Sequence, residues 1–253
     1  MSDAREAAAR ALACLDLTNL DEGCDAAAVD ALCARARTPH GPVAAICVWP
    51  AFVAQAHARL AGSGIKVATV VNFPSGDEDV LSVRTATRQV MIDGADEIDM
   101  VVPWRALAAG ERGTIAATVF EVRDAARNRI LKTILETGEL ADPDLIRRAA
   151  DEALEGGADF LKTSTGKVPV NATPEAALIL LHAIRDCGRD AGLKAAGGVK
   201  TTEDAAGYLA LCDRTMGEGW ATPAHFRIGA SGVLTALLAT LDGAEAPAAK
   251  GNY

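Results

Sequence analysis

Eight short apolar stretches, several of them rich in β-branched residues, recur along the chain, and their spacing constrains the fold more than any other feature. They stand roughly 25–35 residues apart, which is about the length of one strand–helix unit. Most of them are apolar on both faces, as parallel strands are when helices cover both sides of a sheet. We predict strands at residues 12–18, 43–49, 66–73, 97–102, 130–136, 158–164, 192–198 and 226–230.

Helix start and stop signals lie between these stretches. Thr173 followed by Pro174 is typical of an N-cap and a first helical residue. Thr201 with Asp204 has the pattern of a capping box. The glycines in "EGG" at 155–157 favour a helix end, because glycine readily adopts the left-handed conformation found there. The chain therefore alternates strands with helices.

This alternation predicts a single (β/α)8 barrel domain over residues 1–253, with a short helix before the first strand and a flexible tail at 243–253. No linker rich in serine, proline or charge divides the chain. The alternative is an open doubly wound sheet. Such a sheet usually carries a Gly-x-Gly-x-x-Gly turn after its first strand, and no such turn follows residue 18.

Composition narrows the classes of function. The net charge is −9 and no long basic run offsets it, which argues against nucleic-acid binding but allows a small anionic ligand. None of the six cysteines forms a Cys-x-x-Cys pair, and such thiols are typically reduced in cytoplasmic proteins. No segment approaches the ~20 apolar residues of a membrane span. We therefore expect a soluble, cytoplasmic protein without a membrane partner.

Several of the predicted apolar strands also contain polar or reactive residues. In (β/α)8 barrels the active site lies at the carboxyl ends of the strands. The residues concerned are Asp16, Cys47, Asp99, Lys132, Lys162 and Lys194. Taken singly, a strand aspartate is most often structural, a strand lysine usually extends to the rim, and a cysteine most often packs in the core. A structural ion-pair network is the alternative for the whole set, but charged residues from separate strands favour a catalytic cluster.

Lys162 lies in the apolar sequence "ADFLKTS", where an ammonium group is costly to bury. A lysine beside another cation in a dry site loses its proton readily, and its pKa can fall from ~10.4 to ~7–8. The neutral amine can then attack a carbonyl and form a Schiff base. Lys162 and Lys194 lie on consecutive predicted strands, and Asp99 would balance their charge and move protons. We interpret Lys162 as a nucleophile.

Two glycine-containing turns follow the last two predicted strands, in "AAGGVKT" (195–201) and "IGASG" (228–232). Backbone N–H groups at glycine turns and helix N-termini bind phosphate, and these two loops are the usual phosphate site of such barrels. Either turn alone is a weak signal, because ordinary turns are more common. Together they predict a phosphate site, to which Lys167 and Lys200 could add positive charge.

The histidines give no indication of a metal centre. All four are scattered, at His40, His57, His182 and His225, and form no His-Glu-x-x-His motif. A divalent-metal mechanism would need a histidine-rich site, so we expect neither a metal nor another cofactor. Carboxylate-bound magnesium stays open as an alternative.

Stretches carrying these residues recur in one known order: "LDLTNL", "AAICVWP", "ATVVNFP", "GADEIDMVV", "ETGEL", "ADFLKTSTGKVPVNATPEA", "GLKAAGGVKTTEDA" and "RIGASG". The chain resembles the deoxyribose-phosphate aldolases, a class I (Schiff-base) aldolase family, over almost its whole length. "FLKTSTGK" and "GADEIDMV" are the most specific of these motifs. The resemblance implies reversible aldol cleavage of 2-deoxy-D-ribose 5-phosphate to D-glyceraldehyde 3-phosphate and acetaldehyde, without a cofactor.

The resemblance also implies roles for single residues. Lys162 matches the Schiff-base lysine, Lys194 the second lysine that perturbs its pKa, and Asp99 an acid/base aspartate that works through a bound water. Asp16 and Lys132 match a supporting charge network, Cys47 a thiol near the substrate, and Tyr253 a C-terminal tyrosine that helps protonate the donor carbon. The positions that match phosphate-binding loops are Gly166, Lys167, Gly197, Gly198, Val199, Lys200, Ser231 and Gly232.

Three positions depart from the family pattern. Ala195 stands where proline is common, Lys200 where arginine is common, and Gly232 where a second serine is common. Lysine in place of arginine exchanges a bidentate phosphate contact for a point charge, and glycine removes a hydroxyl donor. These changes predict a looser phosphate site with unchanged carbon–carbon chemistry.

Two other functions stay open, together with the oligomeric state. Another Schiff-base aldolase or a transaldolase on the same barrel would keep Lys162 essential but prefer ketone donors. A non-catalytic sugar-phosphate binder would use the same glycines without needing Lys162. The resemblance further implies a homodimer, which the amphipathic pattern of barrel helices neither supports nor excludes.

Overall fold

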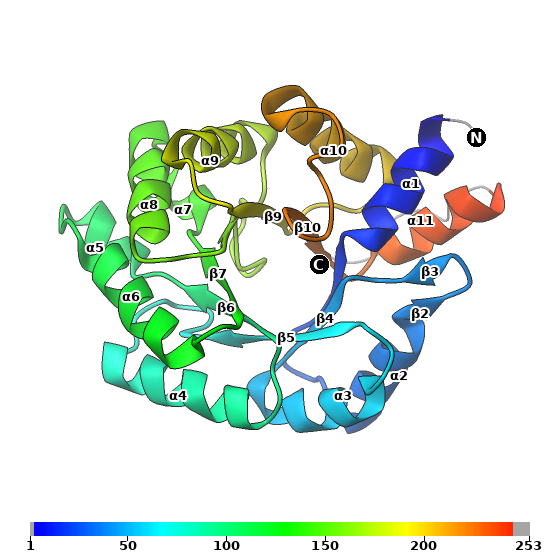
Figure 1. Ribbon diagram of the computed structural model, residues 1–253, viewed down its shortest axis with the longest axis horizontal. Helices are drawn as coiled ribbons and strands as arrows, with labels where there is room; N and C mark the ends of the chain where they lie inside the picture. The colour runs from blue at the N-terminus through cyan, green and yellow to red at the C-terminus, as the bar shows by residue number, and fades with distance from the viewer. Residues whose placement is uncertain (1–2, 245–253) are drawn as a thin grey trace.

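Eight parallel strands close into a barrel in the computed structural model, which describes residues 3–244 (Figure 1). The strands follow one another around the barrel in chain order, and the last pairs with the first. Their bounds are β1 (Leu15–Asn19), β4 (Ala45–Val48), β5 (Lys66–Val71), β6 (Glu97–Val101), β7 (Ile130–Ile134), β8 (Phe160–Lys162), β9 (Gly192–Ala196) and β10 (Phe226–Ala230). All eight predicted strands are confirmed, and the open-sheet alternative is wrong.

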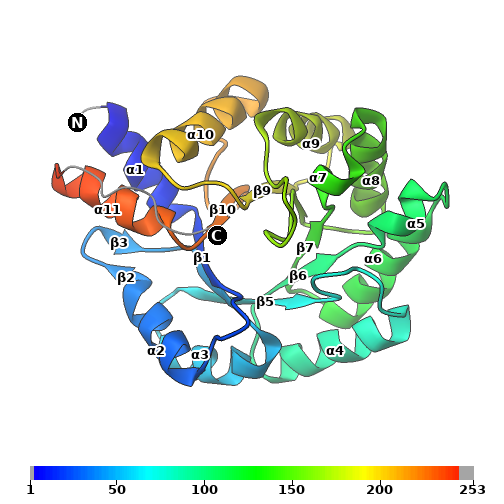
Figure 2. The ribbon, with the colours of Figure 1, turned by 180° about the vertical axis from the view of Figure 1, so that it is seen from behind.

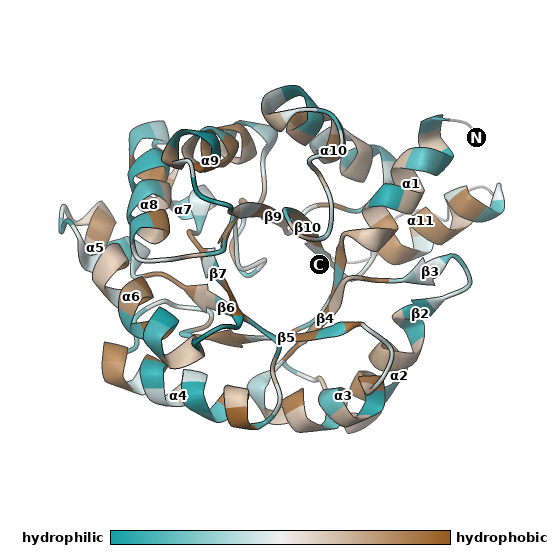
Figure 3. Cartoon of the chain, in the orientation of Figure 1, coloured by the Kyte–Doolittle hydropathy of each residue, from teal (hydrophilic) through white to brown (hydrophobic). Residues whose placement is uncertain are grey.

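Helices connect the strands and form a ring outside the barrel, as the two opposite views show (Figures 1 and 2). They carry both hydrophilic and hydrophobic residues along their length (Figure 3), as expected of helices with one face on a sheet. Their bounds are α1 (Asp3–Ala13), α2 (Ala26–Arg35), η1 (Pro50–Phe52, a 3-10 helix), α3 (Val53–Leu60), α4 (Val80–Ile92), α5 (Trp104–Ala108), α6 (Thr114–Ala126), α7 (Thr137–Leu140), α8 (Pro143–Glu155), α9 (Pro174–Cys187), α10 (Thr202–Met216) and α11 (Val233–Asp242).

The predicted helix signals are confirmed. The Thr173 hydroxyl accepts the backbone N–H of Ala176 at the start of α9. Thr201 and Asp204 form a capping box, in which each side chain accepts the other residue's backbone N–H. Gly157 has φ 102° just after α8 ends. These bonds satisfy helix-end N–H groups that lack a partner within the helix, so they fix where the helices after β8 and β9 begin.

One short hairpin was not predicted, and two predicted segments belong to the ends of the chain. β2 (Arg37–Thr38) and β3 (Gly41–Pro42) form a short antiparallel hairpin after α2, too brief to leave an alternating pattern. The expected N-terminal helix is α1, which packs on α10 and α11. The predicted tail, with Tyr253, falls almost wholly outside residues 3–244.

Apolar residues form two buried clusters. The large one lies between the strands and the surrounding helices. The small one comprises Leu20, Cys47, Ala68 and Val70, with Trp49 and Phe73 packed at its edge. Its members belong to β1, β4 and β5 or directly follow them, so one side of the barrel is apolar. Across residues 3–244, no helix is both long and apolar enough to cross a bilayer.

Candidate active site

The polar residues predicted from the strands all lie inside the barrel. Asp16, Asp99, Lys132 and Lys194 have no solvent exposure, and Lys162 retains 1 %. They share this interior because side chains alternate between the two faces of a strand, and all of these residues lie at inward-facing positions. Burial of three lysines in one interior is costly unless each has a counter-charge. The contacts between them therefore decide what the site can do.

Asp99 contacts all three lysines. Its Oδ1 accepts a hydrogen bond from Lys132 Nζ at 2.9 Å. Its Oδ2 accepts one from Lys162 Nζ at 2.8 Å and one from Lys194 Nζ at 2.7 Å. The strand register explains the convergence, because Asp99 is paired with Lys132, and Lys162 with Lys194, on adjacent strands. One carboxylate thus links β6, β7, β8 and β9.

Two further charged residues complete this network, and the sequence analysis missed both. Glu97 is 1 % exposed and Arg227 is 4 % exposed. Arg227 donates to Asp16 at 2.7 Å and to Glu97 at 2.8 and 3.0 Å, and Glu97 accepts from Lys132 at 2.5 Å. Glu97 could have been found because it lies two residues before Asp99 and so shares its face of the strand. Arg227 had a similar signal, as the charged residue in "FRIGA".

The pKa values of Lys162, on β8, and Lys194, on β9, are shifted in opposite directions. Burial lowers the pKa of Lys162, and the nearby charge of Lys194 lowers it further, against the opposing effect of Asp99. Burial also lowers the pKa of Lys194, but Asp16 and Asp99 outweigh it and hold that pKa well above its ordinary value. Burial is the larger of the two causes that lower the pKa of Lys162, and the role of Lys194 in catalysis stays a prediction.

The number of carboxylate contacts accounts for this difference. Within residues 3–244, Lys132 lies within 4.0 Å of three carboxylates, Lys194 of two, and Lys162 of one. Burial would raise the pKa of Asp99, but the three ammonium groups hold it well below the ordinary range. Lys162 is therefore the lysine most easily deprotonated while its neighbours stay ionised.

Gly229 and Cys47 border the network. A Cβ atom at Gly229 would lie 2.9 Å from Lys194 Cε, so the missing side chain makes room for the lysine stem. Cys47 is completely buried in the small apolar cluster. Burial, with a smaller contribution from Asp99, raises the pKa of its thiol to about 11. The thiol consequently stays protonated at neutral pH.

The predicted phosphate residues lie in the loops after β8, β9 and β10, which are neighbours in the barrel. Gly166, Gly197 and Gly198 have φ of 84°, 79° and 87°, a conformation that favours glycine. Val199 and Lys200 lead into α10, and Ser231 and Gly232 into α11. The backbone N–H of Lys200 already donates to Asp204, so capping engages one of the amides predicted to face phosphate.

Two contacts fix the loop after β8. Lys167 donates from Nζ to the backbone carbonyl of Leu20 at 2.7 Å, which joins this loop to the end of β1. Glu136, buried and with φ 52°, accepts hydrogen bonds from the backbone N–H and the hydroxyl of Thr165. The sequence analysis gave Glu136 no role, although "ETGEL" was one of its motifs. Both contacts hold the segment that contains Gly166.

Comparison with known proteins gives the family. Residues 10–245 match the model of the "DeoC/LacD family aldolase". The chain belongs to the DeoC/LacD aldolase family. It is 53 % identical over 251 residues to the deoxyribose-phosphate aldolase of Agrobacterium fabrum (strain C58 / ATCC 33970), covering 98 % of this chain and 97 % of that protein. This aldolase is accordingly an enzyme of the lyase class.

Solved structures agree with the assignment. A protein of Toxoplasma gondii ME49 assigned as a deoxyribose-phosphate aldolase superposes on this aldolase with a TM-score of 0.87 at 29 % identity, over 96 % of this chain and 99 % of the other. Deoxyribose phosphate aldolase from Aeropyrum pernix, described as having a unique tetrameric structure, gives a TM-score of 0.74 at 22 % identity over 95 % of this chain and 93 % of the other. The second likeness shows the fold alone.

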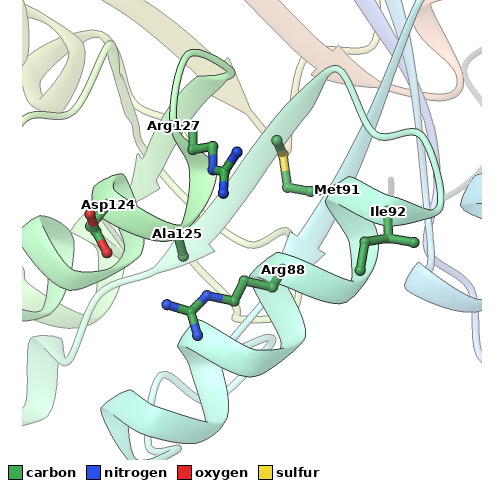
Figure 4. A pocket seen from close by; sticks show the side chains of 6 residues that line it. All are labelled: Arg88, Met91, Ile92, Asp124, Ala125 and Arg127. Atoms are coloured by element: carbon green, nitrogen blue, oxygen red, sulfur yellow. The ribbon is translucent and has the colours of Figure 1, made fainter.

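A surface pocket of about 430 Å³ lies away from these residues, between the ends of α4 and α6 of the aldolase (Figure 4). Arg88 and Ile92 line it from α4, and Arg127 from the residue after α6. Each barrel helix runs back toward the amino end of the next strand, so this pocket opens on the opposite end from the loops after β8, β9 and β10. It is not part of the candidate site.

The described part of the aldolase groups no three His, Cys, Asp or Glu side chains in a way suited to a metal ion. The carboxylates of Asp16, Glu97 and Asp99 are instead joined by Lys132, Lys194 and Arg227. The expectation that the enzyme uses no metal or cofactor stays a prediction. What the interior offers chemically is an amine beside fixed charges.

Proposed function

We propose that this aldolase reversibly cleaves 2-deoxy-D-ribose 5-phosphate into D-glyceraldehyde 3-phosphate and acetaldehyde through a Schiff base on Lys162. The observation that carries the proposal is the contact pattern of the lysines. Lys162 contacts one carboxylate and has a lowered pKa, whereas Lys194 contacts two and has a raised pKa. The name of the Agrobacterium fabrum relative supports the choice of substrate.

The reaction begins with the open-chain aldehyde of the sugar phosphate. The neutral amine of Lys162 attacks the aldehyde carbon, and loss of water gives a protonated imine. Removal of the proton from the C3 hydroxyl lets the C2–C3 bond break. Its electron pair moves toward the positive nitrogen, which leaves an enamine on Lys162 and releases glyceraldehyde 3-phosphate as an aldehyde. Protonation of the enamine carbon and hydrolysis release acetaldehyde.

Asp99 and Lys194 are the proposed proton carriers. Both contact the same region as the Lys162 nitrogen, since the two lysines share Oδ2 of Asp99. Asp99 stays ionised beside three ammonium groups and can therefore accept a hydrogen bond from water, so we assign Asp99 a relay through water and Lys194. Tyr253, which lies beyond the described residues, is proposed to help protonate the enamine carbon.

The phosphate is proposed to bind at the loops after β8, β9 and β10. Gly166, Gly197 and Gly198 adopt positive φ values that favour glycine, a Cβ atom at Gly198 would meet no heavy atom within 4 Å, and Lys167 and Lys200 add positive charge. Neighbouring backbone N–H groups bind anions favourably, so a sugar phosphate fits this end of the barrel. Val199, Ser231 and Gly232 complete the proposed loop set.

Intact mass after incubation with acetaldehyde and borohydride tests the proposal. The wild-type protein should gain the mass of one ethyl group, because borohydride reduces the imine to a stable amine. Lys162→Arg should gain nothing, and Lys66→Arg, which changes an exposed lysine at the start of β5, should behave as wild type. No gain in the wild type would refute the Schiff base.

The same assay separates the alternative functions. A non-catalytic sugar-phosphate binder would gain no mass with acetaldehyde. A Schiff-base aldolase or transaldolase that prefers ketone donors would gain mass with its own donor and not with acetaldehyde. The homodimer expected from the family resemblance is a separate proposal, which sedimentation of the purified protein tests.

A further inference from the structure

Glu97 and Arg227 meet across the barrel, and the mechanism proposed above gives neither of them a role. They belong to β6 and β10, which lie four strands apart in a closed ring of eight and therefore face each other. Arg227 binds Glu97 through Nη2 at 2.8 Å and Nη1 at 3.0 Å, and Asp16 through Nη1 at 2.7 Å. Two nearly buried ions of this kind need a reason, because burying a charge is costly even when it is paired.

The buried charges carried by the strands balance without Lys162. The strands contribute three buried carboxylates, at Asp16, Glu97 and Asp99, while a fourth, Glu136, follows β7. Three cations each lie close to two or more of these carboxylates, namely Lys132, Lys194 and Arg227. Lys162 is the fourth cation, and it contacts one carboxylate oxygen that Lys194 also contacts. A proton on Lys162 is therefore the positive charge in excess.

We propose that the Glu97–Arg227 pair is a positioning element of the aldolase, in which Arg227 supplies the fixed positive charge that makes Lys162 the group that releases its proton. The inference rests on the Schiff-base function proposed for Lys162. Arginine suits this role because its guanidinium stays charged at any pH a protein survives. Its fork binds two carboxylates, its Nε donates to the Pro223 carbonyl at 2.6 Å, and the Phe160 ring lies 5.6 Å from its central carbon.

Other titratable groups around the pair leave this balance intact at neutral pH. Those that face Lys162 or Arg227 are Cys14 before β1, Asp16 in β1, Cys47 in β4, Glu97 and Asp99 in β6, Lys132 in β7, Glu136 after β7, and Lys194 in β9. Burial raises the pKa of Cys14 to about 12 and that of Cys47 to about 11, so both thiols stay neutral. Glu136 is a buried carboxylate that interacts with Lys162, but burial raises its pKa, and its two oxygens accept hydrogen bonds from Thr165.

The test is the pH midpoint of borohydride trapping with acetaldehyde, measured for the wild type, Glu97→Gln, Arg227→Gln and the double variant. Arg227→Gln should move the midpoint up by on the order of one pH unit, and Glu97→Gln should move it down by a similar amount. The double variant removes one charge of each sign and should return to the wild-type midpoint. Arg10→Gln with Asp213→Asn, a pair between α1 and α10, is the matched control and should leave the midpoint unchanged.

The outcomes separate this inference from the function on which it rests. A wild type that is not trapped refutes the Schiff base itself. If the wild type is trapped and every variant has the same pH midpoint, the role of the pair is refuted. It is also refuted if the midpoint of the double variant is displaced as far as that of Arg227→Gln or Glu97→Gln. If Arg227→Gln does not fold, Glu97→Gln and the double variant still decide, because only charge balance predicts that the second substitution reverses the first.

Discussion

Replacing Lys194 with methionine should raise the pKa of Lys162 and silence the enzyme at neutral pH. The two Nζ atoms share Asp99 Oδ2 at 2.8 and 2.7 Å, so they lie at most about 5.5 Å apart, the sum of those distances. At an effective dielectric constant of about 20, two unit charges at that distance repel by about 3 kcal/mol, or roughly two pKa units. Methionine keeps the length of the side chain and removes this repulsion.

The sign of the effect follows from the charges. Repulsion by Lys194 favours the neutral amine of Lys162, so its loss favours the ammonium form and shifts the pKa upward. The neutral fraction at pH 7 should fall by about 100-fold, since each pKa unit is a factor of ten. The rate of adduct formation with acetaldehyde and cyanoborohydride, followed by intact mass from pH 6 to 10, should show its midpoint displaced to higher pH.

Rescue by alkali distinguishes this reasoning from simple damage to the fold. The Lys194→Met variant should recover trapping at high pH, and circular dichroism should show a folded protein at each pH. Lys194→Arg keeps the charge and should keep a midpoint close to that of the wild type. A methionine variant that is folded and has an unchanged midpoint would refute the argument that the second lysine sets the pKa of the first.

Three further predictions concern residues around the network. Gly229→Ala should lower kcat/KM about tenfold and stability by about 1–3 kcal/mol, because the new Cβ would meet Lys194 Cε at 2.9 Å; equal kcat/KM and Tm would contradict this. Glu136→Gln should raise KM for the phosphorylated substrate severalfold but leave acetaldehyde trapping intact, because the amide cannot accept both Thr165 hydrogen bonds; an equal loss of trapping would point to the lysine network instead. The Cys47 thiol, with its pKa raised to about 11 by burial, should resist iodoacetamide at pH 7.5, and rapid labelling in a peptide map would show that it is accessible.

Much of the fold could be predicted from local sequence signals. The apolar stretches and their regular spacing located all eight strands, and side-chain caps such as Thr173 and Thr201 located two helix starts. The short hairpin at 37–42 was missed because two residues per strand leave no periodic pattern. Some strands were predicted too long. The strand predicted at 158–164 is β8 (Phe160–Lys162), because the chain after Lys162 leaves the sheet for a loop with its own hydrogen bonds, such as that from the Lys167 backbone N–H to the Thr165 hydroxyl.

The candidate site was predicted less completely. Asp16, Asp99, Lys132, Lys162 and Lys194 stood out as charges in apolar strands, and the structure brings them together. Glu97 and Arg227 were missed although each is a charged residue in a predicted strand, in "EIDMVV" and "FRIGA". Their importance comes from a partner on the opposite strand of the ring, at a sequence separation of 130 residues.

The sequence by itself determined the barrel and the burial of its lysines. Strand and helix formation depend on residues within a few positions of each other, and an apolar strand with one lysine can only place that lysine inside or at the rim. The tertiary structure alone decided which lysine is poised to lose its proton. Lys162 and Lys194 are chemically identical and face each other in register on adjacent strands. They differ because Lys194 reaches both Asp16 and Asp99 while Lys162 reaches Asp99, and the distances to carboxylates from distant parts of the chain exist only once the barrel has closed.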